Sequence, residues 1–387
     1  MRGMFFYNIR KNIISYLILL WPPINIWFAY FLKGENLLTL YIVYSMLIIL
    51  FCVIRKSTKK VKIETLFILL MLVLVCSLHL ILEISEPTVL LTFTLCVILW
   101  IVFSNRDFQE DFKKFLFNKN YFVYFVETIF LVGLLMSALY GDGILEGGWG
   151  TTTLKGPYLI NHLLAYELLA FLILDLVYWA NDGKSIHLVF SGVFAVLIVL
   201  TGVRSALLAA LLAYLFAFRT KDIKKKFVVL ILGVFLFLFL FFETTLFSGL
   251  IEKTEFAISL GSASNGRGKI FVSSIKALTD RGFSSDWITG IGQEALFMYN
   301  RNNIRQTIHA HNDFINALVQ YGIFGLSVFL MALRKLVRRE WVAFLLIFIL
   351  AFFNGFYMYQ SIVVMTPIII TFSDTVKVVM KREKDLN

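Results

Sequence analysis

The sequence predicts an all-α, polytopic membrane protein. Its 387 residues are 59% hydrophobic and only 16% charged, and the mean hydropathy is +0.81. Soluble domains have an apolar share of roughly 45–50%. Apolar runs recur from one end of the chain to the other, and each is about as long as the 20 residues that a helix needs to cross a bilayer. We therefore expect residues 1–387 to form a single integral membrane domain.

Twelve apolar runs are candidates for transmembrane helices by their length and composition. They are residues 13–32, 37–54, 64–83, 87–104, 120–140, 161–180, 186–202, 204–218, 227–247, 313–333, 341–359 and 361–377. Two segments between these runs are long. The first, 141–160, is rich in Gly and Thr, and the second, 248–312, is the only extended polar region. We expect 248–312 to form one large extracytoplasmic loop.

The distribution of basic residues predicts the orientation. If the N-terminus is inside, 26 of the 36 Lys and Arg residues fall in the inner segments and 10 in the outer ones. Cytoplasmic loops carry such an excess of Lys and Arg. Both termini are therefore expected in the cytoplasm and 248–312 outside. The net charge of +11 follows from this topology, so we expect no nucleic-acid partner.

Cysteine usage indicates neither a disulfide framework nor a metal centre. Cys52, Cys76 and Cys96 all lie inside apolar runs, and an odd intramembrane set does not suit a disulfide scaffold. The sequence has no C-x-x-C motif and no His/Cys cluster. We therefore expect no metal and no cofactor.

The large polar segment has local structural signals. Its stretch "NGRGKIFVSSIKAL" places Ile270, Phe271, Ile275 and Leu278 near helical spacing. This predicts a short amphipathic helix on the outer membrane surface or over the bundle. The following "DRGFSSDWITGIGQE" predicts turns, because Gly and Ser dominate it.

Two arginines stand out because few charges face the outer side. Arg204 lies between two apolar runs in "LTGVRSALLAALLAY", and Arg267 lies between Gly266 and Gly268. Arginine stays charged where water is scarce, and its planar fork matches phosphate oxygens. The alternatives are a snorkelling arginine at a helix end for Arg204 and an ordinary surface arginine for Arg267.

The stretch "RQTIHAHNDFINALVQYGIFGL" places a polar cluster at the edge of an apolar run. His311 is a candidate proton acceptor, since imidazole changes charge near neutral pH. Asn312 could cap the next helix, and Asp313 suits the positive end of that helix. The alternative for the whole cluster, including His309, is a helix cap at the membrane interface. Glu167, in the outer half of its span, could line a cavity.

Three of these stretches, in this order, resemble motifs of the O-antigen ligase and polymerase superfamily. "TGVRSALLAALLAY" resembles the start of a span that carries an arginine between small residues. "NGRGKI" resembles a Gly-Arg element early in the large outer loop, and "HNDFINALVQYGIFGL" resembles a His-Asn motif before a Gly-containing span. The chain departs at Phe271, where the family often has Trp, and at Val203, where it often has Ser. Neither departure removes a charge.

The resemblance implies a GT-C-like membrane glycosyltransferase in the cytoplasmic membrane, with its active site on the periplasmic or extracellular side. The donor would be an oligosaccharide on undecaprenyl diphosphate. Arg204 and Arg267 would bind the diphosphate and His311 would act as the base, supported by Asn312, Asp313, His309 or Glu167. Implied partners are the lipid-linked donor and acceptor, membrane lipids, a chain-length regulator and a flippase.

Three activities are compatible with these features. A polymerase would use a second lipid-linked repeat unit as acceptor, and the compact chain without an added acceptor-docking domain favours it. A ligase would use lipid A-core or another envelope acceptor. A lipid-linked oligosaccharide flippase or other transporter would need charges deep in a central cavity and shorter outer loops. A structural membrane protein would leave the two arginines and His311 unexplained.

Overall fold

The computed structural model describes residues 2–33, 36–55, 62–140, 144–146, 152–219, 267–282, 284–357 and 359–386. This part of the chain is almost entirely helical, with one antiparallel pair of strands in which Ile144 pairs with Leu154. The elements are α1 (Arg2–Phe31), α2 (Leu37–Arg55), α3 (Ile63–Ile81), α4 (Pro87–Phe103), α5 (Arg106–Asn118), α6 (Asn120–Tyr140), β1 (Ile144–Glu146), β2 (Thr152–Leu154), α7 (Asn161–Asp182), α8 (Ser185–Leu200), α9 (Arg204–Phe218), α12 (Arg267–Thr279), α13 (Asp286–Thr289), α14 (Gly292–Ile304), α15 (Asp313–Val337), α16 (Trp341–Phe353) and α17 (Gln360–Leu386).

The helices support an integral membrane protein. Six of them, α1, α3, α6, α7, α15 and α17, are long and apolar enough to cross a membrane, and α4 with α5 makes a seventh candidate that is bent by 80°. The helices α2, α8, α9 and α16 are apolar but shorter. Eleven of the predicted runs thus coincide with helices, while 227–247 lies outside the described residues. The count of twelve spans is not confirmed.

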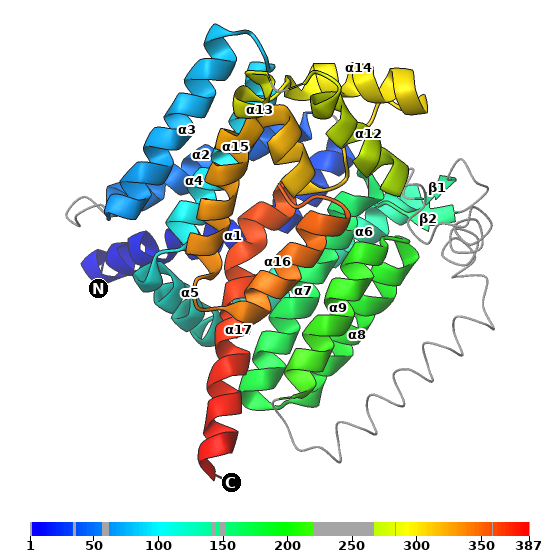
Figure 1. Cartoon of the computed structure of the whole chain (residues 1–387). Helices are drawn as coiled ribbons and strands as arrows, with labels where there is room; N and C mark the ends of the chain where they lie inside the picture. The colour runs from blue at the N-terminus through cyan, green and yellow to red at the C-terminus, as the bar shows by residue number, and fades with distance from the viewer. Residues whose placement is uncertain are drawn as a thin grey trace.

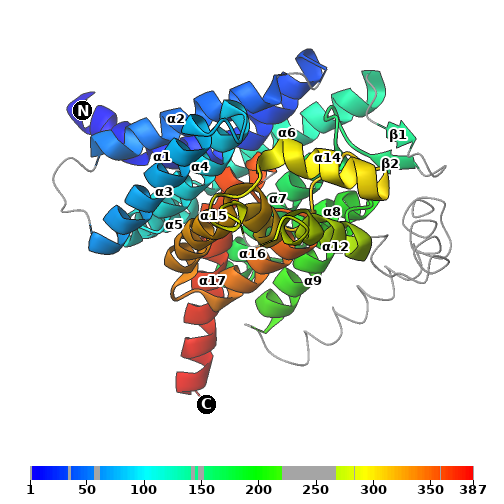
Figure 2. The same ribbon diagram turned by 45° about the horizontal axis from the view of Figure 1, so that its top comes forward.

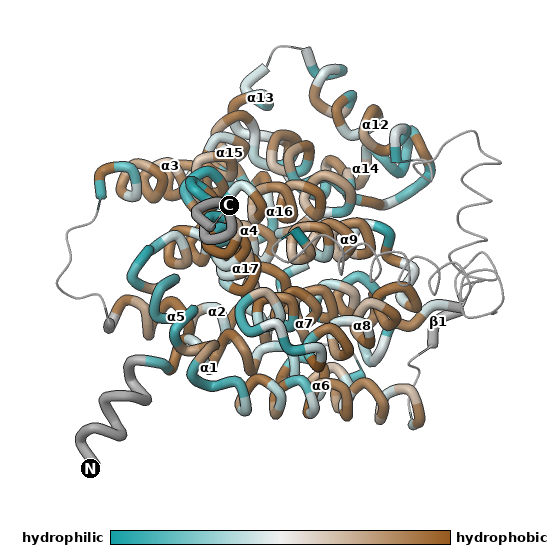
Figure 3. Tube along the Cα trace, turned by 90° about the horizontal axis from the view of Figure 1, so that it is seen from below, coloured by the Kyte–Doolittle hydropathy of each residue, from teal (hydrophilic) through white to brown (hydrophobic). Residues whose placement is uncertain are grey.

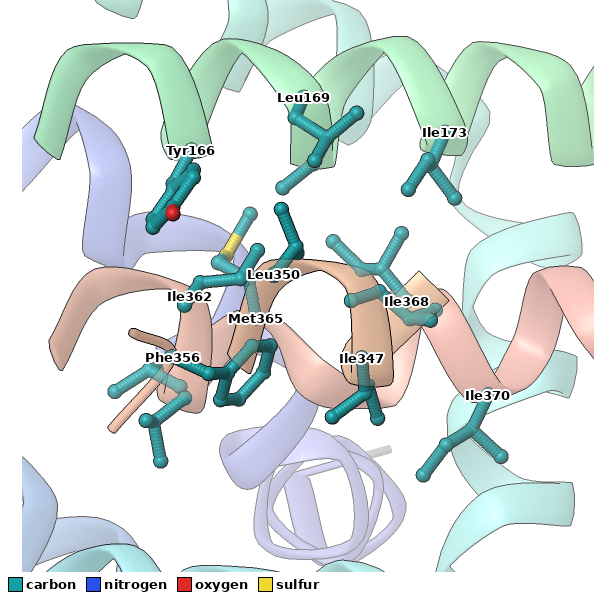
Figure 4. Close-up of a cluster of buried hydrophobic side chains, with 14 of the residues drawn as sticks. Tyr166, Leu169, Ile173, Ile347, Leu350, Phe356, Ile362, Met365, Ile368 and Ile370 are labelled. Carbon is teal, nitrogen blue, oxygen red and sulfur yellow. The ribbon is translucent and has the colours of Figure 1, made fainter. Parts of the chain in front are cut away.

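Helix α7 forms the centre of the bundle and packs against α8, α9 and α17. Its sequence is apolar on all sides, which is typical of a helix buried all round, and 94% of its most apolar window is buried. Figure 4 shows Leu169 and Ile173 of α7 facing side chains of α16 and α17, among them Leu350 and Ile368. The side chains of α7 are therefore fixed in position by packing.

The helices α12, α13 and α14 gather at one end of the bundle, and the C-terminus of α17 lies at the other (Figures 1 and 2). We call the first the site end. The expected amphipathic helix is α12: Ile270 and Leu278 are buried, whereas Ile275 is 40% exposed. The stretch "DRGFSSDWITGIGQE", which was predicted to form turns, contains the short helix α13. The prediction of turns is wrong from Gly292 onward, because α14 begins there. Residues 248–266, the first part of the predicted loop, lie outside the described residues.

The α13 segment is wedged against a break in α15. Gly322 interrupts α15 with φ 68° and ψ −169°, and the Ile291 N–H donates to the Val319 carbonyl at 2.9 Å. A Cβ on Gly290 would lie 2.3 Å from the Gln320 carbonyl oxygen. On the other side, a ring nitrogen of His79 in α3 lies 2.6 Å from the Thr289 carbonyl. Glycine at 290 and 322 therefore allows two backbones to touch.

The predicted span 341–359 is too long, because α16 ends at Phe353. The Asn354 and Gly355 N–H groups both donate to the Leu350 carbonyl, at 3.2 and 3.0 Å, which ends the helix. Gly355 has φ 99°, a backbone conformation that favours glycine. Residues 354–357, which are not helical, then lead towards α17 at the site end.

Candidate functional site

Arg204 is the first residue of α9, placed by a tight turn after α8. Gly202 has φ 65° in this turn, and the Asn161 side chain at the start of α7 donates to the Thr201 carbonyl at 2.6 Å. The residue before the helix, Val203, offers no side-chain cap. The first N–H groups of α9 are thus not capped by a side chain, and such groups favour an anion.

Arg267 is the first residue of α12 and reaches the connection between α16 and α17. Its guanidinium donates to the Phe353 carbonyl and, at 3.3 Å, to the Asn354 side-chain oxygen. Burial, and next the nearby charge of Arg204, lowers the pKa of Arg267. The charge of Arg204 is therefore unfavourable for Arg267. Within the described residues, neither guanidinium forms an ion pair with a carboxylate.

His311 lies in the segment between α14 and α15, beside Arg267. Its backbone is left-handed, with φ 52°, and its imidazole hydrogen-bonds to the Asn354 backbone. Burial, followed by the charge of Arg267, lowers the pKa of His311 from 6.5 to about 4. The imidazole is therefore neutral at physiological pH, which a proton acceptor requires.

His309 occupies a separate niche close to His311. Its ring packs edge-on against Phe297 with centroids 4.6 Å apart, and its Nδ1 lies 3.5 Å from the Gln320 amide nitrogen. Burial, and next the interaction with His311, lowers the pKa of His309 to about 4. The ring of His309 thus contacts Phe297 and Gln320. Of the two histidines, His311 is the one that interacts with Arg267.

Asn312 and Asp313 hold the start of α15 in place. The Asn312 side-chain oxygen accepts from the Phe314 and Ile315 N–H groups at 3.0 and 3.1 Å, as expected for a helix cap. The Asp313 carboxylate accepts from the backbone N–H groups of residues 356 and 357. Asp313 thus ties α15 to the connection between α16 and α17, and it is fully buried.

Asn354 links three parts of this site, and the sequence analysis did not single it out. Its side-chain oxygen accepts from Arg267, its amide donates to the Tyr166 hydroxyl at 3.1 Å, and its backbone binds His311. Asn354 itself is 2% exposed, so its own side chain is shielded from solvent. The dipeptide Asn354-Gly355 is a turn signal within an apolar run, and this signal could have identified the position.

Aromatic rings lie next to these polar groups. Tyr359 packs edge-on against Tyr166, with ring centroids 5.3 Å apart, and it stacks on His162 at 5.2 Å. The Tyr166 hydroxyl also lies 3.4 Å from the Ser205 hydroxyl, one residue after Arg204. The aromatic group thus joins the Arg204 turn to the Asn354 connection. Sequence reasoning missed Tyr166 and Tyr359 because aromatic residues are common in apolar spans.

Glu167 is not part of this group of side chains. Its carboxylate accepts from Asn25 at 2.6 Å, Ser361 at 2.8 Å and Tyr158 at 2.5 Å, and it is fully buried. These partners come from α1, α17 and the segment before α7. Because Glu167 follows Tyr166 directly, the two side chains leave α7 in different directions. Glu167 therefore cross-links helices, and we assign it no contact with Arg204, Arg267 or His311.

Residues 188–330 match the family model of O-antigen ligases. No curated protein and no solved structure matches the chain. The matched segment contains Arg204, Arg267 and His311, which the fold brings to one end of the bundle, but it stops before Asn354.

Proposed function

We propose that the protein is a membrane glycosyltransferase that polymerises undecaprenyl-diphosphate-linked repeat units. One observation carries the proposal. Arg204 and Arg267 lie at the same end of the bundle, joined through contacts of Ser205, Tyr166 and Asn354. No carboxylate in the described chain pairs with them, and the neutral imidazole of His311 interacts with Arg267. Two uncompensated cations at a half-buried site fit an anionic ligand, and a neutral base beside them fits group transfer.

The donor diphosphate would lie between the two arginines and the first turn of α9. Each guanidinium can hold two phosphate oxygens, and the uncapped N–H groups of α9 add positive potential. These groups would stabilise the charge that develops on the leaving diphosphate. The apolar outer surfaces of the helices would accommodate the polyprenyl chain within the bilayer.

In the transfer step, the acceptor hydroxyl oxygen attacks the anomeric carbon of the donor sugar. The new carbon–oxygen bond forms as the bond from that carbon to the diphosphate oxygen breaks. The bonding electron pair leaves with undecaprenyl diphosphate, and His311 takes the hydroxyl proton. No net oxidation occurs. The Asn354 backbone would hold the imidazole in position, which favours reaction by fixing the geometry.

A second lipid-linked repeat unit is the acceptor that we favour, because no folded extra domain for another acceptor is present in the described residues. The ligase reaction, with lipid A-core or another envelope glycan as acceptor, is the second candidate, and the family match supports it equally. A flippase remains the candidate from another class. A flippase would need charged residues deep in a central cavity, and it would leave the bond between the sugar and the diphosphate intact.

The glycan pattern of a deletion strain tests the proposal. A polymerase predicts loss of polymer while one repeat unit stays attached to the acceptor. Loss of all attachment, with polymer accumulating on the lipid carrier, would indicate a ligase. Accumulation of single lipid-linked units on the cytoplasmic side would indicate a flippase.

The orientation that we propose, with the site end outside, can be tested separately. A cysteine at Ser285, next to α13, is introduced in a background without Cys52, Cys76 and Cys96. We expect a membrane-impermeant thiol reagent to label it in intact spheroplasts. Labelling only after the membrane is permeabilised would contradict the orientation.

A further inference from the structure

A cavity of about 850 Å³ opens at the end of the bundle opposite the site end. Its walls come from the start of α3, the α4–α5 bend, the turn between α15 and α16, and the later part of α17. Helix α15 separates it from His311, since α15 begins at Asp313 and reaches the cavity at Lys335. That length corresponds to roughly 30 Å of helix. The cavity is therefore distinct from the proposed active site.

The cavity walls are charged, and their charge balance is positive. Seven Lys or Arg residues and five Asp or Glu residues line it. Figure 3, seen from this end, shows hydrophilic segments along α5 and near the end of α17. Four of the acids have a basic partner: Glu64 with Lys335 at 3.4 Å, Glu110 with Arg106 at 2.9 Å, Glu340 with Lys377 at 3.5 Å and Asp374 with Lys113 at 2.5 Å.

Two cations remain without a carboxylate of their own in the part of the chain that the structure describes. They are Lys62, before α3, and Arg339, after α15, and both side chains are exposed. Arg338 is held only loosely, 3.9 Å from Glu64, which Lys335 already neutralises. The excess positive charge thus lies where α3 meets the α15–α16 turn.

An apolar helix face begins directly beside these cations. On α3, Leu66 is 50% exposed, Phe67 54% and Leu70 59%. Helix α3 has the lowest buried share among the six long apolar helices, with 22% of its window buried. A ligand at Lys62 with an anionic head would therefore meet an exposed hydrocarbon surface immediately along α3.

We propose that this cavity binds the headgroup of an anionic phospholipid, with its acyl chains lying on α3. The phosphate would contact Lys62, Arg338 and Arg339. In the orientation proposed above, this end faces the cytoplasmic leaflet, whose anionic lipids attract basic residues close to the membrane surface. The headgroup supplies the negative charge that the lining lacks, and the tails cover exposed apolar side chains of α3.

The test uses the purified full-length protein in detergent and native mass spectrometry. Phosphatidylglycerol or phosphatidylcholine is titrated, and glycerol 1-phosphate serves as the soluble phosphate. We expect phosphatidylglycerol to be retained more strongly than phosphatidylcholine. Each of Lys62→Gln and Arg339→Gln should weaken its retention about fivefold, which corresponds to about 1 kcal/mol per basic residue near a membrane surface.

Two further variants keep the result interpretable. Arg339→Lys retains the charge and should retain most of the lipid, which separates charge from side-chain loss. Arg301→Gln removes an exposed cation from α14 at the site end and should leave retention unchanged. Equal retention of the two lipids, or wild-type retention in both Gln variants, would overturn the proposal. Binding of glycerol 1-phosphate as tight as that of phosphatidylglycerol would also overturn it, since the occupant would then be a free phosphate.

Discussion

Asn354→Leu should impair transfer through Arg267 without changing the fold. Leucine has the same number of side-chain heavy atoms and the same branching as asparagine, so no cavity forms, but the Arg267 guanidinium loses its acceptor at 3.3 Å. A hydrogen bond to a charged group contributes about 1.5–3 kcal/mol. The bond is long, so we take the lower end, about 1.5 kcal/mol, which corresponds to roughly a tenfold loss in kcat/KM. The Tyr166 hydroxyl keeps contacts at Gly355 and Ser205.

The assay measures turnover of a lipid-linked donor by purified Asn354→Leu, Arg267→Gln and the double variant. Because the asparagine acts through the arginine, the double variant should be no slower than Arg267→Gln alone. Asn303→Ala is the matched control, since that exposed asparagine bonds only within α14. Additive losses in the double variant would refute the reasoning, and so would wild-type activity of Asn354→Leu.

Three further results are expected. Arg204→Lys and Arg267→Lys should each weaken donor binding strongly, because an ammonium cannot replace a bidentate fork; wild-type binding in both would exclude them as the diphosphate ligands. The base His311 must be deprotonated, and its pKa is about 4, so kcat/KM should hold as the pH falls and drop only near 4. An acid limb near 6.5 would contradict this. Gly290→Ala places a Cβ 2.3 Å from a carbonyl oxygen at φ +81°, whereas the Cβ of Gly192→Ala meets nothing within 4 Å. Only Gly290→Ala should therefore lower the free energy of unfolding, by a few kcal/mol in a thermal unfolding experiment.

The helices could be predicted because each needs only a local apolar run. Eleven predicted runs coincide with helices, since a bilayer-length apolar segment satisfies its backbone hydrogen bonds within itself. The breaks could not be predicted in this way. Gly322 interrupts α15 because the α13 backbone packs against it, and this contact joins residues that are distant in sequence. The end of α16 at Phe353 was missed because hydropathy outweighed the Asn-Gly turn signal.

The charged residues of the candidate site could be nominated from sequence for a similar reason. Few charged residues are expected on the outer side, so Arg204, Arg267 and His311 were conspicuous. Asn354 and Tyr166 were not, because one uncharged polar or aromatic residue in a span carries little information. Their roles depend on tertiary contacts. Glu167 was conspicuous for its charge, yet its partners are Asn25, Ser361 and Tyr158.

Turnover and donor binding of His311→Ala and His309→Ala, measured side by side with purified enzyme and lipid-linked substrate, test the central claim most directly. The two histidines are close together and similarly buried, so they form a matched pair. If His311 is the base, His311→Ala should lose about 10²–10⁴ in turnover while donor binding stays close to that of the wild type, and His309→Ala should lose much less. An inactive His309→Ala beside an active His311→Ala would reverse the assignment, and full activity in both would show that neither histidine is the base.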